Sequence, residues 1–191
     1  KSAFSSASQV GAFFSMIENT ISKSLTVKQD SLIMKTIGNF SMYAKNDLSG
    51  VRYVKLGTMY RTQFNKETTG EALLYDPEFI RYSSMIIKRI STRMSGLSTL
   101  FNGNGNPRET KKNYLHLILH GDYTAAAESY LQSDTYHDEF THLPKAEIVP
   151  FWQGSGSGFG WTDTSTIKGI PVGGDAAVTV SNIVGVMFDR D

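Results

Sequence analysis

The stretch Asp76-Pro-Glu-Phe-Ile-Arg-Tyr82 contains the clearest helix start in this chain of 191 residues. Asp76 is a residue type that caps helices, Pro77 is favoured at the first helical position, and Glu78 complements the helix dipole. Apolar side chains then recur at helical spacing until a run of Asn, Gly and Pro ends the pattern. This stripe consists of Phe79, Tyr82, Ile86, Ile90, Met94, Leu97 and Phe101. We therefore expect a long helix over about residues 77–100.

The same predicted helix carries a row of basic side chains, which are Arg81, Lys88, Arg89 and Arg93. A basic stripe of this kind can attract nucleic acid through its phosphates without reading the base sequence. The alternative is an ordinary solvated helix face. We retain these four residues as a candidate basic face.

The segment before residue 76 also carries helical patterns. An apolar stripe at helical spacing predicts a helix over residues 3–23, formed by Val10, Phe14, Ile17 and Ile21. Its remaining surface is rich in Ser, so this helix needs packing to be stable. Thr26-Val-Lys-Gln29 has the form of a capping box and predicts a second helix after it. Val51-Arg-Tyr-Val-Lys-Leu56 is β-branched and aromatic, which predicts a strand.

The rest of the chain is dominated by strand patterns. Residues 114–120 and 148–151 predict two strands, and a helix that begins at Asp122 lies between them. Residues 165–170 and 178–188 predict a hairpin around a Gly-Gly-Asp turn. The element order indicates an α+β fold without a regular βαβ series, with a helix-rich part over about 1–110 and a strand-rich part with one helix over 111–191.

The composition, with 40% hydrophobic and 19% charged residues, is typical of a globular protein, and we expect the chain to form a single unit. Because the chain has no cysteine, disulfides and thiolate metal sites are excluded. No stretch approaches the ~18 apolar residues of a membrane span, so we expect no membrane partner. The chain begins with Lys1 and ends directly after a strand-like run, and we therefore expect it to be a piece of a longer protein.

The net charge of +1 conceals an uneven distribution. Residues 1–95 carry 13 basic and 7 acidic side chains, whereas residues 96–191 carry 6 basic and 11 acidic ones. The two halves either neutralise each other within one fold or attract other copies head to tail.

The histidines and carboxylates do not form a recognisable metal or catalytic pattern. His116 and His120 are four residues apart on a predicted strand, which separates them by about 13 Å. His137 and His142 are five apart, so they do not have the spacing of a helical zinc motif. We therefore expect no metal, no cofactor and no catalytic residues.

The loop Gly154-Ser-Gly-Ser-Gly-Phe-Gly160 resembles a nucleotide-binding loop only in composition. Its glycines fall at every second residue, and the expected continuation is a strand, whereas dinucleotide and phosphate loops open a helix. It also lacks the order of a nucleophile elbow. The aromatic residues around it either pack back onto the core or contact a neighbouring subunit. These candidate interface residues are Phe151, Trp152, Phe159 and Trp161.

Several segments together carry a resemblance to a known family. They are Pro77–Tyr82, Ser98–Phe101, Tyr114–Leu117, Asp122-Tyr123 with the Ala-rich helix, Tyr130–Phe140, Val149–Gly156 and Val184–Asp191. In their order and residue types these segments resemble the major capsid proteins of tailed bacteriophages and prophages, which have the HK97-type fold. The similarity spans most of residues 70–191 and more weakly residues 1–45.

This resemblance implies a structural protein without turnover. Such proteins have a peripheral domain with a long spine helix and an axial domain directed at the capsomer axis. Copies gather into hexamers and pentamers that close into an icosahedral shell around the genome. The resemblance further implies a virion location, assembly in the bacterial cytoplasm, non-specific contact with packaged DNA, and scaffold or portal proteins as candidate partners.

Two other functions fit the same residues. A prophage-derived domain could bind a ligand or nucleic acid through the aromatic loop around Trp152 and Trp161. An encapsulin-like cargo shell would share the fold, and the sequence does not separate it from a virion.

Overall fold

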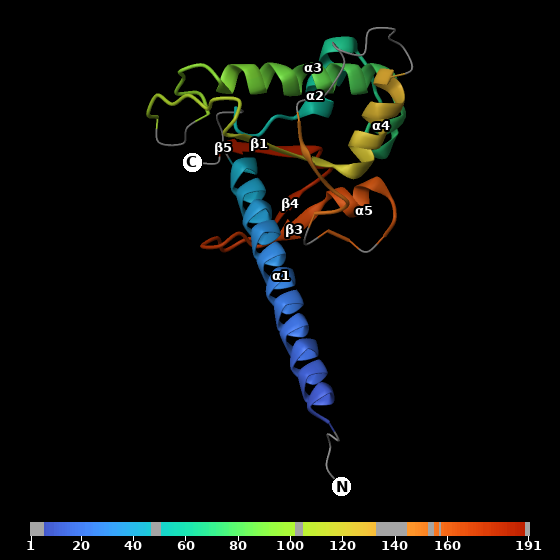
Figure 1. Ribbon diagram of the computed structural model, residues 1–191. Helices are drawn as coiled ribbons and strands as arrows, with labels where there is room; N and C mark the ends of the chain where they lie inside the picture. The colour runs from blue at the N-terminus through green and yellow to red at the C-terminus, as the bar shows by residue number, and fades with distance from the viewer. Residues whose placement is uncertain are drawn as a thin grey trace.

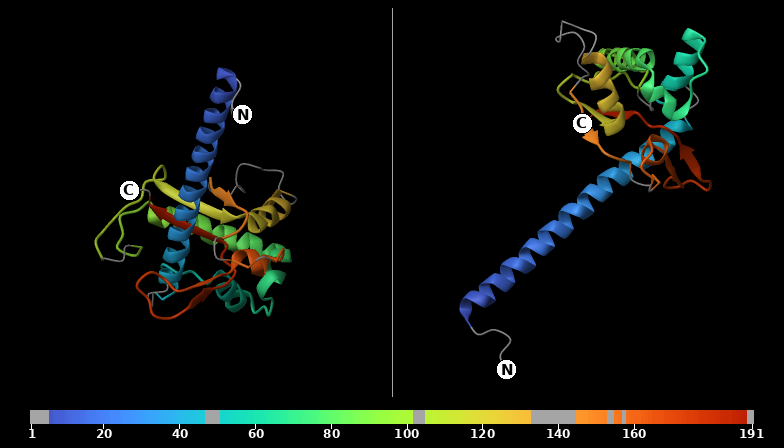
Figure 2. Two further views of the ribbon diagram at one scale, coloured as in Figure 1. Left: turned by 90° about the horizontal axis from the view of Figure 1, so that it is seen from below. Right: turned by 90° about the vertical axis from the view of Figure 1, so that its right-hand side faces the viewer.

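The computed structural model describes residues 6–46, 51–101, 105–132, 145–152, 155–156 and 158–189. It consists of a long helix and a compact body of helices and short strands (Figure 1). The long helix, α1, spans Ala7–Lys45 and joins the body only near its C-terminal end. Its remaining length projects away from the body in all three views (Figures 1 and 2).

A three-stranded sheet forms the centre of the body, with strand order β2-β1-β5. The central strand β1 spans Leu115–His120, and it pairs in parallel with β2 at Glu147–Val149. On its other edge β1 pairs antiparallel with β5 at Gly185–Asp189. Since four of the six β1 residues are buried, this strand is covered on both faces.

Successive side chains of β1 point to opposite faces of the sheet and enter two separate cores. Leu117 and Leu119 belong to a cluster with the helices of one layer. Ile118 belongs to a second cluster, on the side of a small hairpin and the end of α1. The alternation along this one strand therefore holds the two layers of the body together.

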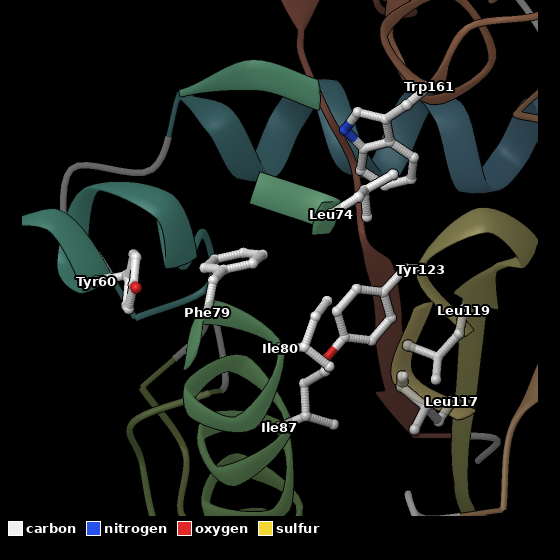
Figure 3. Packing of buried hydrophobic residues seen from close by; sticks show 10 residues of the cluster. Tyr60, Leu74, Phe79, Ile80, Ile87, Leu117, Leu119, Tyr123 and Trp161 are labelled. Carbon is white, nitrogen blue, oxygen red and sulfur yellow. The ribbon is translucent and has the colours of Figure 1, made fainter. Parts of the chain in front are cut away.

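The first layer contains four helical segments. They are α2 at Leu56–Phe64, the 3-10 helix η1 at Gly70–Tyr75, α3 at Pro77–Met94 and α4 at Gly121–Gln132. Figure 3 shows Tyr123 of α4 directed at Ile80 and Ile87 of α3. The buried Tyr123 hydroxyl lies 2.9 Å from Ser83 Oγ and 3.1 Å from Ser84 Oγ, which satisfies it inside the core.

A hydrogen bond joins α2 to the start of α3. The fully buried Tyr60 donates its hydroxyl proton to Asp76 Oδ2 at 2.7 Å, while Asp76 Oδ1 accepts from the backbone N–H of Glu78. Burial, together with the Asp76 carboxylate, raises the pKa of Tyr60 well above its ordinary value. One carboxylate thus caps α3 and positions α2.

The second layer is a hairpin of β3 at Ile167–Gly169 with β4 at Val178–Val180. The short helix α5 at Trp161–Ser165 precedes this hairpin, and its Trp161 side chain packs in the first cluster. The C-terminal end of α1 lies against this hairpin and buries Ile37 and Met42 there. This contact is where α1 joins the body.

The structure confirms the α+β class, the cap of α3, the strand over 114–120 and the helix beginning at Asp122. The predicted length of α3 was wrong, because the helix ends at Met94 rather than near residue 100. Ser98 instead forms an isolated bridge with Arg108, and Leu97 is 73% exposed. An isolated backbone bridge therefore takes the place of the last expected helical turn.

Three other predictions differ from the structure. The expected strand over residues 51–56 is absent, and Leu56 begins α2. The two expected N-terminal helices are one helix, and Thr26 donates its hydroxyl proton to the Ser22 carbonyl instead of capping. The strand expected over 178–188 is divided, because β4 pairs with β3 whereas β5 pairs with β1.

We predict that Gly185→Ala destabilises the protein by about 1–3 kcal/mol. Gly185 faces Leu119 across the β1–β5 pair, and a Cβ there would lie 2.6 Å from the Ile118 carbonyl oxygen. The free energy of unfolding from urea titration measures this effect. Gly11→Ala is the matched control, because a Cβ there meets no atom within 4 Å. The control should be neutral or stabilise by up to about 1 kcal/mol, and equal stability of the two variants would contradict the packing described.

Candidate functional site

The four candidate interface aromatics divide into two buried and two exposed side chains. Trp152 is 1% exposed and donates its indole N–H to the Ile183 carbonyl at 3.0 Å, and Trp161 is 4% exposed. Phe151 is 56% exposed and Phe159 is fully exposed. The tryptophans therefore belong to the core, which corrects their assignment as interface residues, whereas an interface role for Phe151 and Phe159 stays a prediction.

The described part of the Gly-rich loop folds against α5. The backbone N–H of Gly156 donates to the Asp163 carbonyl at 2.9 Å. A Cβ on Gly158 would collide with the Asp163 carboxylate, so a larger residue there would require the Asp163 side chain to shift. The described part of the loop thus approaches a short helix closely, and this close approach at Gly158 requires no phosphate.

A buried histidine joins this loop region to the central sheet. His120 is fully buried at the end of β1, with its ring edge-to-face on Trp161 at 4.8 Å between centroids. Its Nδ1 accepts a hydrogen bond from the backbone N–H of Asp122 at 3.2 Å. Because Nδ1 is an acceptor, the neutral ring carries its proton on Nε2.

The environment of His120 favours the neutral ring. Burial lowers the pKa of His120, while the Asp122 carboxylate and the Thr164 carbonyl act in the opposite direction. A neutral imidazole packed on indole is a structural group.

The histidines and carboxylates in the described ranges do not gather into a metal site. His116 pairs with Glu147 at 3.0 Å across β1 and β2. His137, Asp138, Glu139 and His142 lie outside the described residues.

The candidate basic face lies on the side of α3 that points away from the core. Arg81, Arg89 and Arg93 are exposed and Lys88 is half-buried. At 100° per residue the four side chains fall opposite the buried face of the helix. The structure thus brings them together on one solvent-facing surface.

Sequence reasoning missed a groove of about 760 Å³ beside the edge strand β5. Ile90 and Met94 of α3, Met187 of β5 and Phe40 of α1 contribute apolar surface to it. At one end Asp189 accepts a hydrogen bond from the Thr110 hydroxyl at 2.7 Å. The groove has an apolar lining without a catalytic pair of side chains.

The largest exposed apolar surface follows α1. No side chain between residues 7 and 36, all within the described part of the chain, is buried. Between residues 7 and 36 of α1, the large apolar side chains that are more than half exposed are Phe14, Met16, Ile21, Leu25, Val27, Leu32 and Ile33. No helix of the described residues is long and apolar enough to cross a membrane.

Two features thus distinguish the described surface. Its side chains do not form a catalytic or metal-binding group, and it presents a long helix with exposed apolar side chains. An exposed apolar surface of this kind is typical of proteins that act by contact with other molecules. The sequence profile of the Phi29-like phage major capsid protein family matches residues 1–191, and the chain belongs to this family. No curated individual protein matches the chain.

Membership of this family makes the protein a structural subunit of a bacteriophage capsid, a component of the virion that assembles with its own copies into a shell. This confirms the phage capsid identity expected from the sequence. The alternative of a ligand-binding domain has no support, and its two tryptophans are buried.

We predict that His120 makes the protein sensitive to acid. Its folded-state pKa lies below the ordinary value of 6.5, so the stabilisation is complete above that pH and is lost as pH falls toward the folded-state pKa. The free energy of unfolding should fall by at most about 1.4 kcal/mol per pH unit from this group.

Urea titrations between about pH 7.5 and pH 5 test this, since histidine titrates in that range. His120→Phe should have a weaker pH dependence than the unsubstituted protein. His116→Gln, on the same strand but partly exposed, should keep the original dependence. An unchanged pH dependence in His120→Phe would show that another group is responsible.

Proposed function

We propose that the protein is an HK97-type shell subunit whose copies gather into hexamers and pentamers and close into an icosahedral head around the genome. In this proposal α1 at Ala7–Lys45 is the long spine helix, and the body from α2 to β5 is the axial domain. The sequence had placed the long helix near residues 77–100, but α1 has 39 residues against 18 in α3.

The observation that carries the proposal is the absence of cover on α1 over residues 7–36 of the described chain. Most helices in proteins are stabilised by packing of an apolar face rather than by intrinsic propensity. Exposed side chains such as Phe14, Leu25 and Leu32 also cost free energy in water. Contacts made in a shell would remove both penalties.

Phe151 and Phe159 are proposed as further subunit contacts. Both are large aromatic side chains on the surface near α5. Aromatic residues are enriched at protein interfaces because they bury much area at a small entropic cost. Assembly in the bacterial cytoplasm, and docking of scaffold or portal proteins on the same shell, belong to this proposal.

Electron microscopy of the protein expressed in bacterial cells, alone and with neighbouring phage genes, tests the shell. We expect closed particles of uniform diameter built from six-fold and five-fold capsomers. Phe151→Ser with Phe159→Ser should reduce particle yield several-fold while changing the subunit's unfolding free energy by less than about 0.5 kcal/mol.

Leu97→Ser is the control, because Leu97 is 73% exposed but lies beyond α3, away from the aromatic loop. It should assemble normally. Full particle yield from the double variant would remove the two phenylalanines from the interface, and open sheets or irregular aggregates in every preparation would contradict the shell.

We also propose that the basic face contacts packaged DNA without sequence preference. Its support is the gathering of Arg81, Arg89 and Arg93 on the outer side of α3.

Arg89→Ser with Arg93→Ser should make DNA binding less dependent on salt. The slope of the logarithm of the binding constant against the logarithm of the salt concentration should fall by about 0.9 for each DNA phosphate that these arginines no longer neutralise. Binding to duplex DNA at several salt concentrations measures this slope. Lys111→Ser with Lys112→Ser, exposed and outside α3, is the matched control, and equal slopes in the two variants would place the DNA elsewhere.

A further inference from the structure

We propose that the projecting part of α1 pairs antiparallel with the same helix of a second copy, about a twofold axis beside residue 23. The inference rests on the proposed shell, because it names one contact within it. It also identifies the occupant of the exposed apolar surface as another copy of this chain. The argument uses the line of the side chains, their charge pattern and the position of the body.

The apolar side chains that would form the contact lie along one side of α1. They are Val10, Phe14, Ile17, Ile21, Leu25 and Leu32. Their spacing of three, four and seven residues keeps them within about 80° around the helix at 100° per residue. Phe14, Ile21, Leu25 and Leu32 are each more than half exposed, and Val10 and Ile17 are partly exposed. We call this row the α1 stripe.

The α1 stripe is separate from the surface by which α1 joins its own body. The body covers Ile37, Ser41 and Met42 near the C-terminal end of the helix. At 100° per residue Ile37 and Ser41 point about 160° away from the centre of the stripe, and Met42 points about 60° away from it. Because Ile37 and Ser41 face nearly opposite to the stripe, the body does not cover it, and the stripe needs a different partner.

The stripe is complementary to itself when one copy is reversed. With the axis beside residue 23, Ile21 lies opposite Leu25 and Phe14 lies opposite Leu32 of the second copy. The same register brings Glu18 opposite Lys28, and both are exposed. A twofold contact repeats each of these pairs, because it uses the same surface twice.

Charge decides between the two directions of pairing. A parallel pair in register would bring Glu18 beside Glu18 and Lys28 beside Lys28, which are like charges. Exposed ion pairs stabilise by only about 0.2–1 kcal/mol each, so the apolar side chains provide most of the attraction. The charges determine direction and register.

The shape of the subunit permits this contact. The body packs against α1 at Met34 and through buried residues from Ile37 onward, and the helix before Met34 extends clear of the body (Figure 2). The free segment, residues 7–33, is about 40 Å long at 1.5 Å per residue. In the antiparallel pair each body would lie at one end, next to the start of the partner's helix, so the two bodies do not compete for space.

Disulfide cross-linking tests the register, and the chain has no cysteine of its own. Copies with Ile21→Cys are mixed with larger, tagged copies carrying Leu25→Cys, under assembly conditions and then under mild oxidation. We expect about half of the pairs in an equal mixture to form the mixed dimer, the share that random pairing allows, because the two Cα atoms would come within the ~7 Å that a disulfide allows. Phe14→Cys alone is the control, since antiparallel pairing separates its two copies by about 27 Å.

Charge reversal supplies a second readout that a misfolded variant would not imitate. Glu18→Lys alone and Lys28→Glu alone should each lower the fraction of paired subunits in sedimentation velocity by several-fold. Glu18→Lys combined with Lys28→Glu should restore it, because the opposite charges meet again with their positions exchanged.

The outcomes separate this inference from the shell on which it rests. Closed particles in which Ile21→Cys and Leu25→Cys do not cross-link would overturn the pairing, leave the shell intact and show that another surface covers the stripe. Efficient cross-linking of Phe14→Cys would also overturn it, in favour of parallel pairing. A mixed dimer with charge rescue but without closed particles would support the pairing and contradict the shell.

Discussion

The burial of β1 on both faces is the constraint on which the rest of the body depends. Leu117 and Leu119 are 4% and 1% exposed and require the helical layer of α3 and α4, while Ile118 at 3% requires the hairpin layer and the end of α1. Because the period of a strand is two, a shift of one residue would exchange the two cores. The register with β2 and β5 therefore fixes the positions of all the helices around the sheet.

The contrast between this body and α1 explains how the molecule can act without reactive groups. The body buries many of its apolar side chains, together with the neutral His120 packed on Trp161, although Leu97, Phe151 and Phe159 stay exposed. The free part of α1 leaves its apolar side chains in water. A capsid subunit must be soluble before assembly yet gain free energy when copies meet, and the contact proposed for the uncovered helix would provide this gain. The family to which the chain belongs is one of phage shell proteins, and this division suits such a role.

The sequence predicted those elements whose signals are local. Asp76 and Pro77 specify the start of α3 through capping chemistry, and residues 114–120 have the length and β-rich composition of a buried strand. Phe151 and Trp152 are adjacent aromatics, yet one is exposed and the other buried. Residue type does not distinguish these two side chains. The indole N–H of Trp152 donates to the carbonyl of Ile183, which lies thirty-one residues further along the chain.

Other errors have the same cause. The apolar run over 178–188 reads as one strand, but a residue with left-handed backbone, Asn182, interrupts it and sends the chain to a different sheet. The groove beside β5 is formed by segments from α1, α3 and β5 that are distant in sequence. Leu56, Tyr60 and Phe64 have helical spacing that could have revealed α2, but the β-branched residues before them favoured a strand. Long-range contacts decided each case.

Hydrogen exchange on the isolated subunit and on assembled particles tests the central claim most directly. The account predicts slow exchange in β1 in both samples, because that strand is buried within each subunit. It predicts that the amides of α1 between residues 7 and 36 exchange quickly in the isolated subunit and become strongly protected in particles. Equal exchange of this segment in both samples would contradict the claim that the uncovered helix is the surface on which copies assemble.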